Sequence, residues 1–135
     1  MRFAAILALL AGAVPAAAQT PILPLRDVRA GLIATGRTVF AGEKIEEFRA
    51  EILGVLENVA PRQSIILARL SGGPLERTGV LQGMSGSPVY YDGKLIGAVA
   101  LSFPFSKEPV CGIRPIEEML MAGPSAPPPP RAGDP

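Results

Sequence analysis

The sequence contains no histidine and a single cysteine among its 135 residues. The absence of histidine removes the side chain that most often serves as a metal ligand and as a general base. One thiol cannot form a disulfide within the chain, and Cys111 is expected to be a small apolar strand residue rather than a reactive or intermolecular thiol. We therefore expect no metal site and no cofactor.

Positive and negative charges are nearly balanced, and the glycine and proline content does not favour long helices. Thirteen Lys and Arg residues against twelve Asp and Glu residues leave a net charge of +1. This balance gives no electrostatic reason to expect binding to nucleic acid or to an anionic membrane. Fifteen glycines and fifteen prolines favour turns and strands. A chain of this length holds one small domain, and no internal repeat is present.

The N-terminal apolar run is too short to span a membrane. Arg2 supplies a positive charge, residues 3–14 are apolar, and residues 16–18 are all alanine. This pattern predicts a signal peptide over residues 1–18, with Gln19 as the mature N-terminus. The alternative is a short buried helix, which would need a polar face. We expect export to the periplasm, cell envelope or extracellular space, and no integral membrane span after cleavage.

Composition divides the rest of the chain into three parts. Prolines at positions 21 and 24 predict an extended lead-in over residues 19–36, running as a surface strand or linker. Residues 37–122 form the predicted domain. Residues 123–135 form a proline-rich tail, with four prolines at 127–130, expected to be disordered or in a polyproline II conformation.

Apolar alternation predicts an all-β domain. In the segment 47–56, residues Phe48, Ala50, Ile52 and Gly54 share one face, although helical spacing also fits this segment. Residues 58–63 and 71–78 are expected to be loops. The predicted strands are 37–40, 47–56, 64–70, 79–82, 87–91, 94–102 and 110–114.

Two local signals mark a hairpin and a helix. Asp92-Gly93 lies between two strand patterns, and this dipeptide strongly favours a two-residue hairpin turn. Pro115 suits the first position of a helix, and Glu117 and Glu118 follow in its first turn. We expect a short C-terminal helix that ends near residue 121.

The run Gly-Met-Ser-Gly-Ser-Pro at 83–88 stands between two predicted strands. Flanking glycines permit backbone angles that a β-carbon forbids. Such a turn can direct the N–H groups of Gly83 and Ser85 to one point as an oxyanion hole, beside the hydroxyl of Ser85 as nucleophile. The alternative is an ordinary Gly/Ser/Pro-rich turn with no chemical role.

Residues 31–121 resemble the SpoIVB-type serine peptidases of family S55. The Gln-Gly-Met-Ser-Gly-Ser-Pro run is the most specific part, since trypsin-like enzymes more often have Asp where Met84 stands. The resemblance implies a partial trypsin-like β-barrel, the serine-bearing half, with Ser85 as the nucleophile and a protein or peptide as substrate. The matching pieces are residues 43–48, 51–52, 78–79, 82–88, 92–99, 112–113 and 116–120.

The chain departs from the family at the other two triad positions. The family's histidine lies far upstream, in a region with no counterpart here, and its aspartate position corresponds to Gly73, before Pro74. A serine hydroxyl is a weak nucleophile without a neighbouring base. The remaining candidates are Glu76 and the three lysines, and each is expected to be solvated: Lys44, Lys94 and Lys107.

Three hypotheses remain open at this stage. The first is an exported S55-like peptidase domain, incomplete or inactive alone, that needs a base from a partner or from a longer protein. The second is a non-enzymatic binding module, whose exposed strand edges accept an extended peptide or favour self-association. The third is a structural envelope protein whose tail binds a reader of polyproline.

Overall fold

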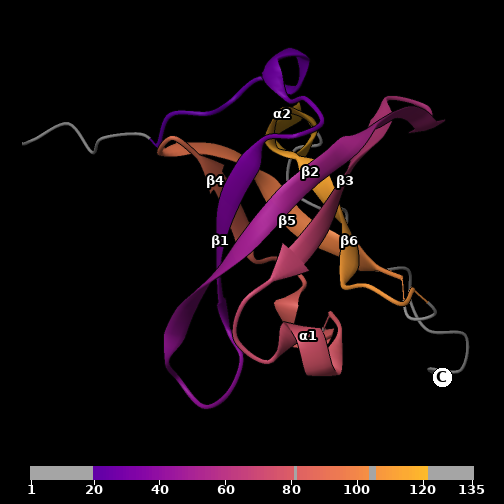
Figure 1. Ribbon diagram of the computed structural model, residues 1–135. Helices are drawn as coiled ribbons and strands as arrows, with labels where there is room; N and C mark the ends of the chain where they lie inside the picture. Colours follow the sequence, from indigo (N-terminus) through magenta and orange to yellow (C-terminus); the bar gives the residue numbers. More distant parts are fainter. Residues whose placement is uncertain (1–19, 81, 104–105, 122–135) are drawn as a thin grey trace, which may run out of the picture.

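The computed structural model describes residues 20–80, 82–103 and 106–121. The predicted signal peptide over 1–18 and the predicted tail over 123–135 lie outside the described residues. Most of the described chain is strand, as the alternation predicts (Figure 1). The elements are η1 (Leu25–Asp27), β1 (Ile33–Val39), β2 (Ile45–Ala60), β3 (Gln63–Ser71), α1 (Leu75–Thr78), η2 (Gln82–Met84), β4 (Pro88–Tyr91), β5 (Lys94–Ser102), β6 (Val110–Pro115) and α2 (Ile116–Met121).

The six strands form one closed antiparallel barrel in the order β1-β2-β3-β6-β5-β4. The ring closes where β1 pairs with β4, through Thr35 opposite Tyr90 and Gly36 opposite Val89. The predicted all-β barrel is confirmed. The expectation of exposed strand edges is wrong, because each of these six strands has a neighbour on both sides and closure removes the edges.

Two strands extend beyond their predicted limits by several residues, β3 extends by one residue at each end, and β6 extends by one residue at its C-terminal end. β1 begins at Ile33 rather than at residue 37, and β2 continues through the predicted loop to Ala60. Only Pro61 and Arg62 form the turn to β3, with Arg62 at a φ of 58°. Proline lacks an N–H group, so in the sequence it indicated a loop, but at the tip of a hairpin that group is not needed.

The segment between β3 and the serine turn contains one helical turn where a loop was predicted. The predicted strand over residues 79–82 is wrong: Gly79 caps the helical turn with a φ of 69°, Val80 is in no strand, and Gln82 begins η2. The N–H groups of Thr78 and Gly79 donate to the carbonyls of Pro74 and Leu75, at 3.0 and 2.8 Å. The fully buried Leu75 side chain anchors this turn, α1, on the barrel. The predicted C-terminal helix is present as α2, at the opposite end of the barrel from α1 (Figure 1).

The lead-in is part of the packed structure rather than a surface linker. Leu23 and Val28 are buried in the core. The N–H of Leu23 donates to the carbonyl of Leu95 at 2.9 Å, and the N–H of Leu95 donates to the carbonyl of Pro21 at 2.8 Å. The sequence pattern did not predict these apolar contacts, because two isolated apolar residues form no periodic pattern.

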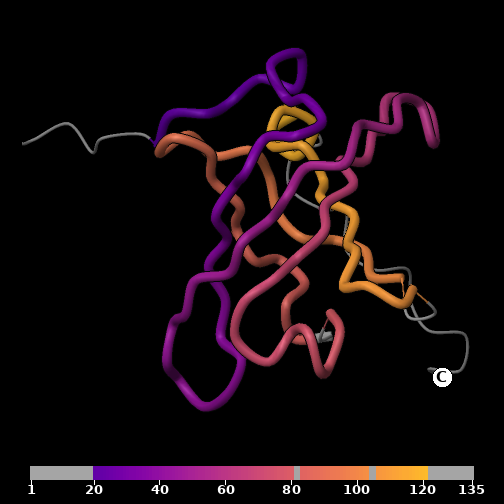
Figure 2. The backbone as a smooth tube through the Cα atoms, in the orientation of Figure 1, coloured from indigo at the N-terminus to yellow at the C-terminus, as the bar shows by residue number. Residues whose placement is uncertain are grey.

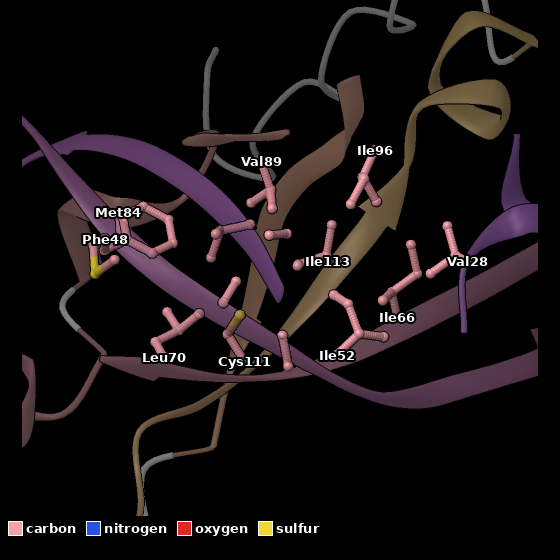
Figure 3. Packing of buried hydrophobic residues seen from close by; sticks show 14 of the residues in the cluster. Val28, Phe48, Ile52, Ile66, Leu70, Met84, Val89, Ile96, Cys111 and Ile113 are labelled. Carbon is pink, nitrogen blue, oxygen red and sulfur yellow. The ribbon is translucent and has the colours of Figure 1, made fainter. Parts of the chain in front are cut away.

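The core fills the barrel with the inward residues of all six strands (Figure 3). Phe48, Ala50 and Ile52 are buried as predicted, whereas Gly54 is only half-buried because the β2–β3 register shifts between Ile52 and Gly54. Cys111 is fully buried in β6, as expected for a small apolar residue. Its burial raises the pKa of the thiol to about 12.

The β4–β5 hairpin confirms the strongest local prediction. Asp92 and Gly93 have φ angles of 50° and 73°, the positive values that a two-residue type I′ turn requires. The turn lies near the lead-in, while the β1–β2 loop and α1 lie together at the other end of the barrel (Figure 2). The serine turn joins α1 to β4 and therefore starts from that second end.

Candidate functional site

Ser85 stands on a turn that is held firmly against β5. The N–H of Gly86 donates to the carbonyl of Val99 at 2.7 Å, and the N–H of Val99 donates to the carbonyl of Ser87 at 2.9 Å. A further bond within the turn joins the N–H of Ser87 to the carbonyl of Met84 at 2.9 Å. Ser85 itself is exposed. The turn therefore presents the Ser85 hydroxyl to solvent on a fixed backbone.

The Met84 side chain holds the serine turn on the core of the barrel. It is fully buried and lies at the same end of the core as Phe48 (Figure 3). The sequence marked this position only as a departure from the aspartate of trypsin-like enzymes. An unbranched thioether side chain fills irregular core space well, and here it holds the serine turn on the barrel by apolar contact.

A buried hydrogen bond joins the turn to β1. The hydroxyls of Ser87 and Thr38 lie 2.8 Å apart, and both residues are buried. The β1–β4 ladder ends at Gly36 and Val89, so this side-chain bond continues the contact where backbone pairing stops. Sequence reasoning placed Thr38 in a strand but gave no sign that it meets the serine turn.

The two predicted oxyanion donors flank Met84. Gly83 lies inside the 3₁₀ turn η2, and Ser85 follows its last residue. The oxyanion hole formed by the N–H groups of Gly83 and Ser85 stays a prediction.

A surface depression of about 420 Å³ opens beside Ser85. Exposed apolar side chains from the β1–β2 hairpin form part of its wall: Val39 is 40% exposed and Ile45, its cross-strand partner, is 70% exposed. Arg37 is the one charged residue among the described residues that line it. The described residues that line it are Arg37, Thr38, Val39, Ile45, Gly83, Ser85, Gly86, Ser87 and Pro88.

None of the candidate bases from the sequence lines this depression. Lys44 is 80% exposed at its side chain and lies 4.0 Å from Glu46. Lys94 is exposed in the β4–β5 hairpin, and Lys107 lines a different depression together with Glu76. Arg37 cannot lose its proton in a protein, so it cannot act as the base. Within the described residues, the Ser85 hydroxyl has no general base beside it.

Gly73, which the sequence resemblance predicts to correspond to the triad aspartate, has a backbone suited to glycine. Its φ is 51°, and a β-carbon there would lie 2.7 Å from the nearest ring carbon of Phe40. Phe40 packs against the core. A side chain at position 73 therefore requires the Phe40 ring to move, and restoring aspartate by one substitution would disturb this contact.

The described residues contain neither a cluster of metal-binding side chains nor a helix suited to crossing a membrane. No group of three or more His, Cys, Asp or Glu side chains gathers there in a way that holds a metal ion. No helix in the same part of the chain has the length and apolar character needed to cross a membrane.

Comparison with known proteins assigns the chain to a family. No curated protein and no solved structure matches it. The family model described as SpoIVB peptidase S55 matches residues 13–120, which is well over half of the sequence and includes every strand of the barrel. This match agrees with the resemblance carried by the serine turn and its flanking strands. The chain belongs to the SpoIVB peptidase S55 family.

Proposed function

We propose that this chain is an exported peptidase-type domain in which Ser85 occupies the nucleophile position, and that it is incomplete as an enzyme on its own. Family membership supports the peptidase class and a protein or peptide as partner. The pattern of residues 1–18 supports export. The observation that carries the proposal is the exposed Ser85 on a clamped turn, with no histidine in the sequence to activate it.

The missing base limits what the turn can do chemically. Without imidazole, an oxyanion hole and substrate binding together give only roughly 10³–10⁴-fold over the reaction in water. Among the described residues, neither Lys nor Glu lines the depression beside Ser85, and Gly73 supplies no carboxylate. Peptide hydrolysis at this serine therefore requires a base from outside the given residues, either from a partner or from the rest of a longer protein.

The second candidate function is a peptide- or protein-binding module that keeps the peptidase fold. The exposed apolar pair Val39 and Ile45 beside Ser85 favours it, because these side chains offer contact area without any reacting group. Addition of a peptide to a free sheet edge is no longer part of this candidate, since the barrel is closed. Binding would instead use the depression.

A fluorophosphonate probe tests the proposal, because it reacts with activated serines. The mature chain, Ser85→Ala and Ser106→Ala are labelled in parallel, with folding checked by far-UV circular dichroism. Ser106 is an exposed loop serine and serves as the matched control. We expect no Ser85-dependent labelling of the chain alone, and labelling that appears when free imidazole is added to the chain and to Ser106→Ala but not to Ser85→Ala.

The other outcomes are equally informative. Labelling that depends on Ser85 in the absence of imidazole would show that a base reaches the hydroxyl, and the claim of incompleteness would be wrong. A folded chain in which imidazole produces no Ser85-dependent labelling would favour the binding module.

A further inference from the structure

The depression beside Ser85 has a simple chemical character. Its exposed apolar wall consists of Val39 and Ile45, and Arg37 is the one charged residue among the described residues that line it. No Asp or Glu is among those described lining residues. A ligand that covers the apolar wall and neutralises one positive charge would match this surface.

The Arg37 side chain lies near Tyr90 and Glu47 but forms no close ion pair with a carboxylate among the described residues. Its guanidinium carbon lies 5.6 Å from the centre of the Tyr90 ring, within the range of a cation–π contact. Its Nε lies 3.8 Å from a carboxylate oxygen of Glu47, its cross-strand partner, and both side chains are more than half exposed. An exposed pair at this separation contributes little and leaves guanidinium donors available to another carboxylate.

Arg69, by contrast, is an arginine whose side-chain donors are used in hydrogen bonds to carboxylates. Its Nε donates to Glu108 at 2.7 Å and its Nη1 donates to Glu51 at 3.3 Å. Among the described residues, Arg37 donates no hydrogen bond of this kind. The contrast separates a guanidinium used in a surface ion network from one that still has its donors free.

The carboxylates near Arg37 lie on its other side. Glu47 and Asp92 line the neighbouring depression, which also contains Tyr90 and Arg37. Arg37 therefore stands between two shallow surfaces, one with acidic side chains and one with Ser85. The guanidinium faces Tyr90 and Glu47, whereas the described residues that line the depression beside Ser85 include no acidic side chain to repel an incoming carboxylate.

We propose that Arg37 selects a carboxylate in the peptide that occupies the depression beside Ser85. The carboxylate is either an Asp or Glu side chain or a free C-terminus, and an adjacent apolar residue covers Val39 and Ile45. The inference rests on the proposed function, since it assumes that a peptide binds beside Ser85. It makes Arg37 a specificity-determining residue, because guanidinium groups recognise carboxylates through paired N–H donors.

Three pentapeptides test the proposal by fluorescence anisotropy, each with a fluorophore at its N-terminus and leucines on both sides of the central residue. The first has a central aspartate and an amidated C-terminus, the second has asparagine in its place, and the third has asparagine and a free C-terminal carboxylate. Binding is measured on the chain, on Arg37→Gln and on Arg62→Gln. Arg62→Gln removes the same charge at the β2–β3 turn, outside the depression.

The chain should bind at least one carboxylate peptide about tenfold more tightly than the neutral peptide, as expected for a charge-assisted hydrogen bond at an exposed site. The preferred peptide identifies the carboxylate source. Arg37→Gln should abolish the preference and Arg62→Gln should retain it. Equal binding of all three peptides, a preference that survives in Arg37→Gln, or no binding of any peptide would overturn the proposal.

The labelling experiment and the peptide-binding experiment can fail independently of each other. Fluorophosphonate labelling reports on the Ser85 hydroxyl, whereas the peptide series reports on Arg37 and can be repeated in Ser85→Ala. A chain that prefers carboxylate peptides but is never labelled supports this inference and favours the binding module. A chain labelled with imidazole that shows no preference supports the nucleophile assignment and removes the role of Arg37.

Discussion

The hydroxyls of Thr38 and Ser87 lie 2.8 Å apart inside the protein and join β1 to the turn that presents Ser85. The two residues are 49 positions apart in the sequence. The bond lies where the β1–β4 ladder has ended, so it closes the barrel seam beside the candidate site. It therefore connects barrel stability to the position of the serine.

A double-mutant cycle should measure this bond. Ser87→Ala or Thr38→Val alone leaves a buried hydroxyl without its partner and should lower the free energy of unfolding by about 1–3 kcal/mol. The double variant should cost about 1 kcal/mol less than the sum of the two, because no unpaired hydroxyl remains. Urea denaturation gives the four values. Strict additivity would show that the hydroxyls do not interact.

Gly97 in β5 should not tolerate a side chain. A β-carbon there would lie 2.0 Å from the carbonyl oxygen of Arg114, which is backbone and cannot rotate away. Gly97→Ala should lower the free energy of unfolding by on the order of 3 kcal/mol, or prevent folding. Gly54→Ala is the matched control, since nothing lies within 4 Å of its added carbon. Equal thermal denaturation midpoints for the two variants would contradict the close approach of β5 and β6.

Glu118 in α2 should stabilise the start of β3. Its two carboxylate oxygens accept the Ser64 N–H at 2.8 and 3.0 Å, and Ser64 is buried. Glu118→Ala should cost about 1–3 kcal/mol, because that N–H would lose its partner. Glu118→Gln should cost less, since the amide keeps one acceptor oxygen. Chemical denaturation of both, with exposed Met119→Ala as control, checks the order; a loss for Met119→Ala as large as for Glu118→Ala would argue against it.

Cys111 should make stability fall at high pH. Burial raises the pKa of its thiol from 9.0 to about 12, so the folded protein keeps this proton where the unfolded chain loses it. Stability from this group is fully present below pH 9 and is lost as pH rises from about 9 to 12. The free energy of unfolding of Cys111→Ala should therefore decline less steeply over that range. Parallel declines in the two proteins would show that the thiol is not the cause.

Local chemistry explains the parts of the fold that were predictable. Asp92-Gly93 favours positive φ angles, and these angles form the β4–β5 turn. Pro115 and the acidic residues after it predicted the start of α2 to within one residue: the helix begins at Ile116, and Pro115 ends β6 instead of occupying the first helical position. The alternation around Phe48 identified the inward face of β2. In each case the signal and its structural consequence lie within a few residues of each other.

The sequence by itself indicated most of the strand segments, the hairpin turn and the turn that carries Ser85, because residue period and backbone preference act over a few neighbouring residues. Only the tertiary structure decided that β1 closes the ring on β4, that Thr38 meets Ser87, and that Arg37 stands beside Ser85. A period of two specifies which side chains point inward but not which strand becomes the neighbour. That choice depends on the twist and stagger with which the strands close, and the candidate site lies at the seam where they meet.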